Sequence, residues 1–355
     1  MKAARLHQPG APLTVEEIRE PELRPGSVIV RVESAFVAPS AADVVGGRLP
    51  FPLPPTPFTP GMDTIGVIEQ VAGDVHGLDE GQRVYCDHYF ATRVPGAPSD
   101  PSFIGYFGFT PASRRLLENW RDGSFAEKVV IPAECVTPLG PASSLDASRL
   151  CRLGYLGTAY GAFLRGGFRP SQNILVNGAT GVLGVSTVLL GLAMGASRVA
   201  CVGRKERVLA RLHELDPRRI VTFARRNDGS DAARIAEAAA GSDLMIDALG
   251  YVDDPSLTLD ALAALRPGGT AVLMGGGMAD LPISYRMILG MELTLRGSMW
   301  FPRTAAAEML AMIGAGSLNL SRLAPRVFPL ERINEAIAAA AARPDGFEHV
   351  ALMMR

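Results

Sequence analysis

Hydrophobic residues in the second half of the chain fall into two alternating patterns. Short uninterrupted apolar runs predict strands over 173–177, 198–202, 219–223, 243–247 and 270–274. Apolar positions at helical spacing predict helices over 182–194, 205–214, 231–240 and 255–265. Uninterrupted runs are typical of strands buried on both faces of a parallel sheet. The alternation therefore predicts an α/β fold whose parallel sheet carries helices on both faces.

The first 140 residues show a different hydrophobic pattern, in which strand-like segments dominate. Such segments begin at Val28, Thr64 and Gly81, and prolines crowd residues 50–60, where they predict an extended loop. Residues 87–122 interrupt this rhythm with aromatic, glycine and proline residues and a helix predicted over 113–120. We interpret that segment as an inserted lobe, either a functional loop or a connector.

The tail after residue 290 predicts an edge strand over 292–298, helices over 303–314 and 331–342, and strands over 326–330 and 349–354. We expect this tail to return to the first domain. The predicted organisation is a β-rich domain over 1–143, a dinucleotide-binding domain over 144–290, and an edge strand with a return segment over 291–355.

A glycine-rich turn separates the strand at 173–177 from the helix that follows it. Gly178, Gly181 and Gly184 stand at three-residue spacing, and this strand–turn–helix context predicts a dinucleotide site. We expect Gly178 to make the tight turn, Gly181 to let the pyrophosphate approach, and Gly184 to let helix and strand pack closely. The alternative is a glycine-rich turn without a ligand.

Composition narrows the function classes. A length of 355 residues favours two domains, and a net charge of −1 gives no case for nucleic acid or an acidic membrane surface. Four scattered cysteines indicate a reducing compartment, and we expect a cytoplasmic protein without membrane partners. Residues 170–197 contain no charged side chain, but glycines interrupt them and their helical part is too short to cross a bilayer.

The residues that follow the second strand of the predicted parallel sheet indicate which cofactor binds. NAD sites usually place an acidic residue there, whereas this chain has Gly203, Arg204 and Lys205. The two cations can hold a 2′-phosphate through charge-assisted hydrogen bonds, so we expect NADPH. Glu206 keeps NAD as the alternative, although a first-turn helix position explains it better. We interpret Arg207 and Arg211 as a solvated helix face.

Seven spaced motifs together resemble the medium-chain dehydrogenase/reductase superfamily over essentially the whole chain. They lie at 60–66, 123–127, 157–162, 178–184, 247–250, 266–269 and 297–298. The resemblance implies a GroES-like catalytic domain, a Rossmann domain, a cleft between them, and pairing of two copies through the strand at 292–298. We expect a homodimer acting on a small molecule.

The resemblance also bears on zinc. Zinc members carry Cys, Gly-His-Glu and a second Cys, where this chain has Ser40, Met62 with Asp63, and Gly154. A catalytic zinc needs about three converging N, S or O ligands, so we expect no metal. Residues 87–122 also lack the four cysteines of the structural zinc site. His88 is an exception to test, and its simpler interpretation is a solvated or hydrogen-bonded loop residue.

Without zinc, hydride transfer favours acceptors that delocalise the negative charge that the hydride brings. The chain is thereby similar to the quinone oxidoreductase-like and enoyl reductase branch, which implies an NADPH-dependent reductase of a conjugated carbonyl or quinone. One alternative is a metal-free alcohol or carbonyl oxidoreductase of a biosynthetic pathway. Another is an NADPH-binding sensor or structural protein without catalysis.

The branch often carries a proton-donating Tyr where this chain has Leu49. We take Asp43, Tyr155 and Thr158 as catalytic residues, although Asp43 can instead cap a helix and Thr158 can be a buried helix-start hydroxyl. Other replacements are water, Tyr85, Tyr89 and Tyr106.

Cofactor-lining residues are expected at the carboxyl ends of the parallel strands. They are Gly178, Thr180, Gly181, Val182, Leu183 and Gly184 in the glycine turn, Gly203, Arg204 and Lys205 after the second strand, and Leu249, Gly250, Gly275 and Gly276 after the fourth and fifth strands.

Overall fold

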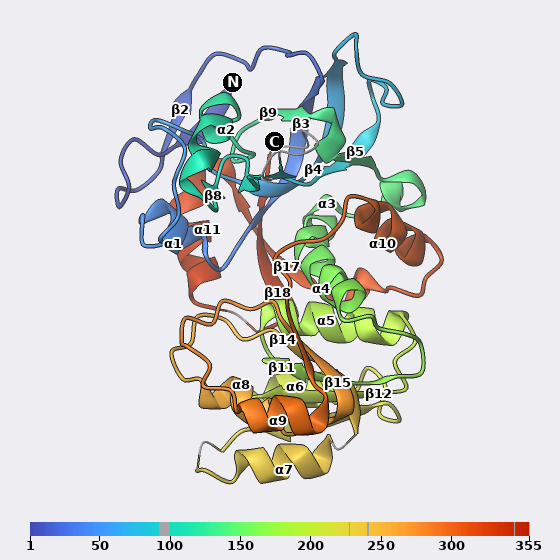
Figure 1. The fold of residues 1–355 in the computed structure, drawn as a ribbon. Coiled ribbons are helices and arrows are strands. Elements are labelled where there is room, and N and C mark those ends of the chain that lie inside the picture. Colours follow the sequence, from blue (N-terminus) through green and yellow to red (C-terminus); the bar gives the residue numbers. More distant parts are fainter. Residues whose placement is uncertain (92–99, 227, 240, 344, 355) are drawn as a thin grey trace.

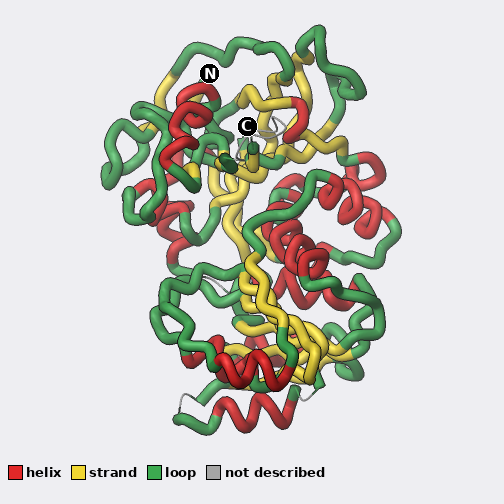
Figure 2. The backbone as a smooth tube through the Cα atoms, viewed as in Figure 1, coloured by secondary structure: helices red, strands yellow, loops and turns green. Residues whose placement is uncertain are grey.

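The structure is a computed structural model that describes residues 1–91, 100–226, 228–239, 241–343 and 345–354. Two domains lie one above the other, with the chain passing from the upper to the lower domain through the green helices (Figure 1). Strands and loops dominate the upper domain, whereas helices flank the sheet of the lower one (Figure 2).

The upper domain is built on one sheet with strand order β10-β5-β4-β3-β18-β17, and β9 also pairs with β3. The strands are β3 (Ser27–Val37), β4 (Met62–Val71), β5 (Arg83–Cys86), β9 (Lys128–Pro132), β10 (Val136–Pro138), β17 (Ala324–Pro329) and β18 (Glu348–Met353). A separate hairpin joins β1 (Lys2–Arg5) to β2 (Thr14–Glu17). Because β18 pairs with β3, the end of the chain is part of the first domain's sheet.

Two helices from opposite ends of the sequence lie beside this sheet. They are α1 (Ala41–Val45) and α11 (Ile333–Ala341), blue and red in Figure 1, and they contact each other. Asp43 lies inside α1 rather than before it, and Ser40 occupies the N-cap position. The interpretation of Asp43 as a helix cap is therefore wrong.

The segment predicted as an inserted lobe contains a small sheet and one helix. β6 (Tyr89–Phe90), β7 (Ser102–Phe103) and β8 (Phe107–Gly108) pair in that order, and α2 (Arg114–Asn119) follows. The predicted helix over 113–120 matches α2 within one residue at each end. Residues 92–99 of this lobe lie outside the described residues.

The lower domain contains the predicted parallel sheet, in the order β13-β12-β11-β14-β15-β16. Its strands are β11 (Asn173–Asn177), β12 (Arg198–Gly203), β13 (Ile220–Ala224), β14 (Ser242–Asp247), β15 (Leu265–Leu273) and β16 (Thr294–Gly297). Its helices are α5 (Val182–Ala193), α6 (Glu206–His213), α7 (Asp231–Ala238), α8 (Ser256–Leu262) and α9 (Tyr285–Met291). The α/β prediction is confirmed.

Both faces of this sheet are buried, as the uninterrupted apolar runs predict. Val176 faces the core shared with α5 and α6, whereas the adjacent Leu175 faces the core shared with α7, α8 and α9. Successive side chains of a strand point to opposite faces, so an all-apolar run can feed two cores at once.

The predicted elements omit α4 (Leu153–Arg165), which precedes the first strand of the parallel sheet. Ten of its thirteen residues are buried, so it has no polar face to produce a helical period. Gly154, Gly157 and Gly161 also lower its helix propensity by up to about 1 kcal/mol each relative to alanine. Two further helices, α3 (Ala147–Leu150) and α10 (Thr304–Gly314), lie next to it.

A single buried arginine joins these parts at the start of α4. Arg152 is fully buried, and its Nε donates to the Ser186 hydroxyl at 3.1 Å. Its Nη2 donates to the carbonyls of Val182 and Gly346, and Nη1 donates to the carbonyl of Glu348 at 3.4 Å. The first turn of α5 and the segment entering β18 are thereby held against each other.

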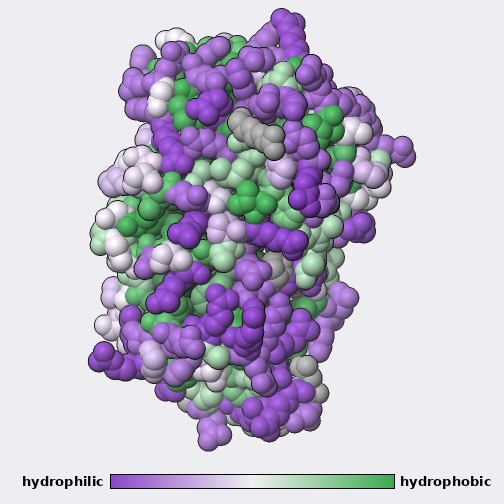
Figure 3. Space-filling model, turned by 180° about the vertical axis from the view of Figure 1, so that it is seen from behind, coloured by the Kyte–Doolittle hydropathy of each residue, from purple (hydrophilic) through white to green (hydrophobic). Residues whose placement is uncertain are grey.

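Hydrophobic and hydrophilic residues are unevenly distributed on one face of the molecule (Figure 3). Seen from behind, hydrophobic atoms gather around the middle of the molecule, and the end formed by the lower domain is mostly hydrophilic (Figure 3). In the described part of the chain, every helix is too short or too polar to cross a bilayer.

Candidate active site

A cavity of about 560 Å³ lies between the two domains. The upper domain lines it with Ser40, Met62 and Tyr106, among others, and the lower domain lines it with the loops that follow its parallel strands. This volume falls within the range of ligand pockets, which is about 300–1,000 Å³. Ligands of open α/β sheets bind at this carboxyl edge.

The glycine turn forms one wall of the cavity. Gly178 has a φ of +77°, which a residue with a side chain adopts only with strain. A Cβ on Gly184 would lie 2.2 Å from the Gly178 carbonyl oxygen, so only glycine lets α5 sit this close to β11. Gly178 and Gly181 line the cavity, whereas Gly184 lies behind the turn and shapes it.

All the other residues expected to line the cofactor site also face this cavity. They are Thr180, Val182, Leu183, Gly203, Arg204, Lys205, Leu249, Gly250, Gly275 and Gly276. Together they follow the carboxyl ends of β12, β11, β14 and β15 along one edge of the sheet.

The basic end of the cavity lies after β12. Gly203 packs against Thr180, and a Cβ at 203 would lie 2.4 Å from its methyl carbon, so an acidic side chain has no room there. The Arg204 side chain is exposed and makes no hydrogen bond or ion pair with any residue that the structure describes. The Lys205 ammonium donates to the carbonyl of Arg343 at 2.9 Å, which draws the return segment over this end.

Arg207 and Arg211 lie near this end on the predicted solvated face of α6, where the Arg207 side chain is 78% and the Arg211 side chain 37% exposed, and both also form ion pairs. The guanidinium groups of Arg207 and Arg211 pair with the Asp345 carboxylate at 2.9 and 2.8 Å. Asp345 belongs to the return segment before β18, so these ion pairs fasten α6 to the end of the chain.

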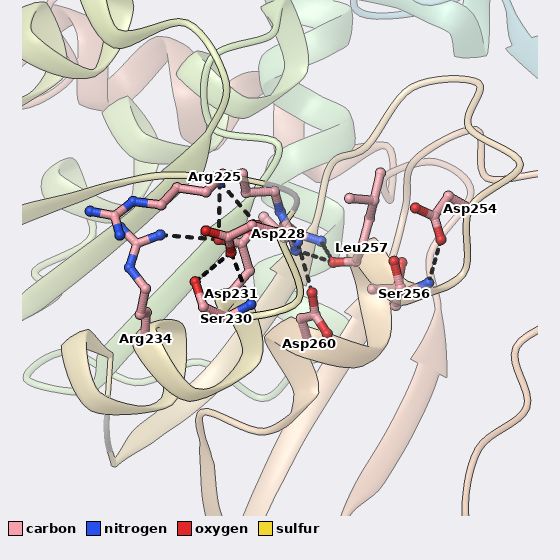
Figure 4. Close-up of polar contacts among 12 residues, drawn as sticks. Arg225, Asp228, Ser230, Asp231, Arg234, Asp254, Ser256, Leu257 and Asp260 are labelled. Carbon is pink, nitrogen blue, oxygen red and sulfur yellow. Dashed lines mark hydrogen bonds and ion pairs between the residues drawn. The ribbon is translucent and has the colours of Figure 1, made fainter.

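A buried arginine that the sequence interpretation missed also lines the cavity. Arg225 follows β13 and ion-pairs with Asp260 at 3.0 Å and with Asp231 at 3.9 Å. Figure 4 shows it reaching from its strand end between the helices that carry these two acids. It also donates to the carbonyl of Leu257. Its charge is therefore compensated inside the protein, unlike that of Arg204.

The far end of the cavity is apolar and aromatic. Phe103, Phe107, Met299 and Trp300 line it. The Phe103 and Trp300 rings meet edge-on with centroids 4.7 Å apart, and Trp300 stacks on Phe301 at 4.7 Å. Phe301 lies so close to α4 that a Cβ on Gly157 would be 2.3 Å from its ring. The glycines of the 157–162 motif thus let this aromatic segment dock on the helix.

The expected catalytic residues occupy three different environments. Thr158 lines the cavity from the middle of α4 rather than from a helix start, and its hydroxyl donates to the Gly154 carbonyl at 2.9 Å. Tyr155 lines the cavity and packs on Phe36 with ring centroids 4.8 Å apart. Asp43 is outside the cavity lining, and its carboxylate pairs with Arg48 at 2.8 Å.

The other tyrosines considered as proton donors differ in whether they line the cavity. The Tyr85 hydroxyl is buried and donates to Asp63 at 2.7 Å, and Tyr89 stacks on Trp300 with centroids 6.0 Å apart. Neither lines the cavity, whereas Tyr106 does.

The residues missed by sequence reasoning come mainly from distant parts of the chain. Arg343, Tyr251 and Trp300 all line the cavity. No local pattern marks them, because each reaches the site through the docking of one segment on another. Arg225 differs, since its place directly after a predicted strand of the parallel sheet was a usable signal.

Comparison with known proteins gives matches along most of the chain. Residues 24–141 match the alcohol dehydrogenase GroES-like domain, and residues 182–315 match the zinc-binding dehydrogenase family. An alcohol dehydrogenase from Moraxella sp. is 28% identical over 336 residues, which is 94% of each chain. The chain belongs to the medium-chain dehydrogenase/reductase superfamily. Its predicted GroES-like and Rossmann domains are confirmed.

Solved structures of this superfamily share the fold at low identity. A putative zinc-binding dehydrogenase from Sinorhizobium meliloti, bound to NADP, is 21% identical with a TM-score of 0.79. An alcohol dehydrogenase from E. coli, complexed with NADH, is 20% identical with a TM-score of 0.82. The first comparison covers 99% of this chain and 98% of the other, and the second covers 99% of each. These structures show the shared fold, and the match to the zinc-binding dehydrogenase family supports a dehydrogenase fold that binds a nicotinamide dinucleotide.

The positions of the superfamily's zinc ligands have an unusual geometry in this chain. Asp63 is fully buried with a φ of 51°, and its carboxyl group fills the space beside Gly154. A Cβ on Gly154 would lie 2.1–2.2 Å from the carboxyl atoms, so a cysteine cannot stand there with Asp63 in place. Burial raises the pKa of this carboxyl well above its usual range, although the hydrogen bond from Tyr85 opposes the shift.

His88 does not supplement these positions. It is fully buried, and its Nδ1 lies 3.3 Å from the carbonyl of Cys86, so it is a hydrogen-bonded loop residue and not a solvated one. Burial lowers the pKa of this imidazole to about 4. Across the described ranges, no three His, Cys, Asp or Glu side chains come together as a metal site.

Asp87 supports the aromatic wall and gives a prediction about pH. Its carboxylate accepts from the Trp300 indole at 2.8 Å and from the Tyr89 backbone N–H at 2.9 Å, and burial raises its pKa to about 7. The unfolded carboxyl ionises near pH 4, so between pH 4 and 7 the folded state binds more protons. The Asp87 ionisation therefore lowers the free energy of unfolding as pH rises through this window.

We expect Asp87→Asn, which keeps an oxygen acceptor, to remove this loss. Chemical denaturation at pH 5 and pH 8 measures the difference between variant and native protein. The variant should gain stability relative to the native protein at pH 8 and much less at pH 5. An equal difference at both pH values would contradict the raised pKa.

Proposed function

We propose that the protein is an NADPH-dependent, metal-free reductase that transfers hydride to a conjugated carbonyl or a quinone. The observation that carries the proposal is the continuity of one cavity. It runs from the glycine turn and Arg204 to an aromatic chamber, passing Ser40 and Met62 at two positions where zinc relatives hold their metal. Bound there, a reduced nicotinamide would supply the hydride.

The metal-free part of the proposal rests on the donor set. Met62 offers a thioether, which is a poor zinc ligand, and Gly154 offers no side chain. A larger residue at position 154 has no room either, because the buried Asp63 carboxyl occupies the space that its side chain would need. The residues present therefore do not fit a catalytic zinc ion.

The choice of acceptor follows from the chemistry of the site. Hydride addition to a simple ketone leaves a full charge on one oxygen, which a metal or a strong donor normally stabilises. An enone or a quinone spreads that charge over a conjugated system and needs less help. Flat conjugated molecules also suit the chamber formed by Phe103, Phe107 and Trp300.

A metal-free alcohol or carbonyl oxidoreductase is the second candidate, because the curated relatives are named as alcohol dehydrogenases. A nucleotide sensor without catalysis is the third, since the chain has departed from two usual catalytic sets. The three differ in which compounds, if any, oxidise the cofactor.

We expect purified protein to oxidise NADPH with an enone or a quinone and to leave a simple ketone largely unreacted. Loss of absorbance at the reduced-nicotinamide wavelength measures this for all three acceptors under one set of conditions. Turnover with the ketone alone would contradict the proposal and favour the second candidate. Tight NADPH binding without any turnover would favour the sensor.

Metal content provides the control for that experiment. Elemental analysis of protein purified without chelators should find zinc far below one ion per chain, and added chelator should leave the rate unchanged. Stoichiometric zinc that is required for turnover would overturn the ligand argument.

The preference for NADPH is supported by the contrast between two arginines. The Arg204 side chain is exposed and forms no ion pair or hydrogen bond with the described residues. The Arg225 side chain is buried, and its charge is neutralised by ion pairs with Asp260 and Asp231. Only the first is available for the 2′-phosphate, and Lys205 stands next to it. Gly203 excludes the acidic residue on which NAD sites depend.

We expect Arg204→Ala to weaken NADPH binding about 10–100-fold, as the loss of a charge-assisted hydrogen bond predicts, and to change NADH binding little. Fluorescence titration of both cofactors measures the two dissociation constants. Arg218→Ala is the matched control, because Arg218 is exposed on the same domain but away from the cavity. An equal loss for both cofactors would refute the phosphate assignment.

We also propose a homodimer through the edge strand β16. On the side away from β15, this strand pairs with no described strand. Tyr285 and Leu289 of the neighbouring α9 are 82% and 65% exposed, and such exposed apolar groups mark interaction surfaces. Light scattering should give twice the chain mass, and Leu289→Glu should shift it toward one chain. A native monomer would refute the proposal.

A further inference from the structure

Ser40 holds a hydroxyl group that its own helix does not use. It is the N-cap residue of α1, a position where serine normally accepts a hydrogen bond from the first turn. Here no such bond forms, and the half-buried residue lines the cavity instead. Its backbone carbonyl bonds to the helix, so the chain is fixed while the hydroxyl remains available.

A second hydroxyl lies behind it, on the inserted lobe. Tyr106 is 2% exposed, and its ring packs beside Phe107 with centroids 5.5 Å apart. Its hydroxyl oxygen is buried and meets no described partner with full hydrogen-bond geometry. The Ser40 side chain is nevertheless close enough to act on it as a hydrogen-bonding neighbour.

Tyr106 is the more deeply buried of the two residues. Removal from water raises the pKa of Tyr106 well above its usual range, and the neighbouring Tyr155, Tyr251 and Asp63 raise it further, although Ser40 opposes the shift. The Tyr106 hydroxyl has no other described partner, so donating to the Ser40 oxygen would satisfy its buried proton. A proton donated by Tyr106 to the Ser40 oxygen leaves the serine proton pointing away from the phenol, toward the cavity.

We propose that Ser40 is a catalytic residue that hydrogen-bonds the carbonyl oxygen of the substrate, and that Tyr106 is the positioning residue that orients it. The inference rests on the proposed reductase function and assigns the donor that replaces a metal at this site. It makes the inserted lobe a part of the catalytic machinery.

For an enone, the step balances as follows. Hydride from NADPH forms a C–H bond at the β-carbon, and the electrons of the C=C bond shift to leave an enolate oxygen. The Ser40 hydroxyl stabilises that oxygen, with Tyr106 donating to Ser40. A proton from water then adds to the α-carbon, so enone, NADPH and one proton give the saturated ketone and NADP⁺.

Two other hydroxyl groups, those of Thr158 and Tyr155, line the cavity. Thr158 already donates its proton to the Gly154 carbonyl at 2.9 Å, so it can accept from a substrate but not donate. Tyr155 lines the cavity and is the real competitor. Its removal is therefore part of the test.

The test compares Ser40→Ala, Tyr106→Phe, the double variant and Tyr155→Phe in turnover of 4-phenylbut-3-en-2-one with NADPH. We expect Ser40→Ala to lower kcat about 100-fold, as for the loss of one oxyanion donor, and Tyr106→Phe about tenfold. If Tyr106 acts through Ser40, the double variant should be no slower than Ser40→Ala. Ser40→Thr should recover part of the rate.

Tyr160→Phe is the matched control, because it removes a tyrosine hydroxyl that bonds Glu308 outside the cavity lining. It should leave kcat unchanged. Thermal melts and NADPH titrations of each variant separate loss of fold or cofactor binding from loss of catalysis. A large loss in Tyr155→Phe with little loss in Ser40→Ala would overturn the assignment.

A binding measurement separates failure of this inference from failure of the proposed function. Calorimetric titration of the NADP⁺-loaded protein with the same enone needs no turnover. We expect Ser40→Ala to weaken enone binding about tenfold, as for the loss of one buried hydrogen bond, and Tyr160→Phe to leave it unchanged. Such a result without native turnover would reject the reductase and keep the hydroxyl site. No enone binding, or equal binding by Ser40→Ala, would overturn the inference.

Discussion

The cofactor cleft depends on one buried charge, the guanidinium of Arg152. It has no carboxylate partner in the described chain, and it is satisfied instead by carbonyls of Val182, Gly346 and Glu348 and by the Ser186 hydroxyl. Hydrogen bonds to a charged group contribute about 1.5–3 kcal/mol each. The first turn of α5 and the return of the chain are therefore fixed to each other, and the cleft forms where they meet.

This joint explains why the cavity is lined by both ends of the sequence. Asp345 pairs with Arg207 and Arg211 on α6, and the Lys205 ammonium reaches the carbonyl of Arg343. The same return segment continues as β18 between β3 and β17 of the upper sheet. The basic end of the cavity is thus closed by residues that also complete the catalytic domain's sheet.

The parallel sheet, its flanking helices and the glycine turn could be predicted from sequence, because buried strands and glycine turns leave local patterns. Gly178 and Gly184 are examples, since each is required by geometry within one strand–turn–helix unit. Buried α4 left no helical period, and Arg343 and Trp300 reach the site only through long-range docking. The environment of Asp63 was equally hidden, because it depends on a glycine 91 positions later.

The fit between Asp63 and Gly154 also constrains how the site can change. A cysteine introduced at 154 would collide with the carboxyl group, whereas loss of the carboxyl first would leave a buried void beside Tyr85. Met62 would have to become a ligand as well. Each single step toward a metal site is therefore unfavourable before the others are made. The packing of Asp63 against Gly154 therefore opposes any single substitution that would begin to build a metal site here.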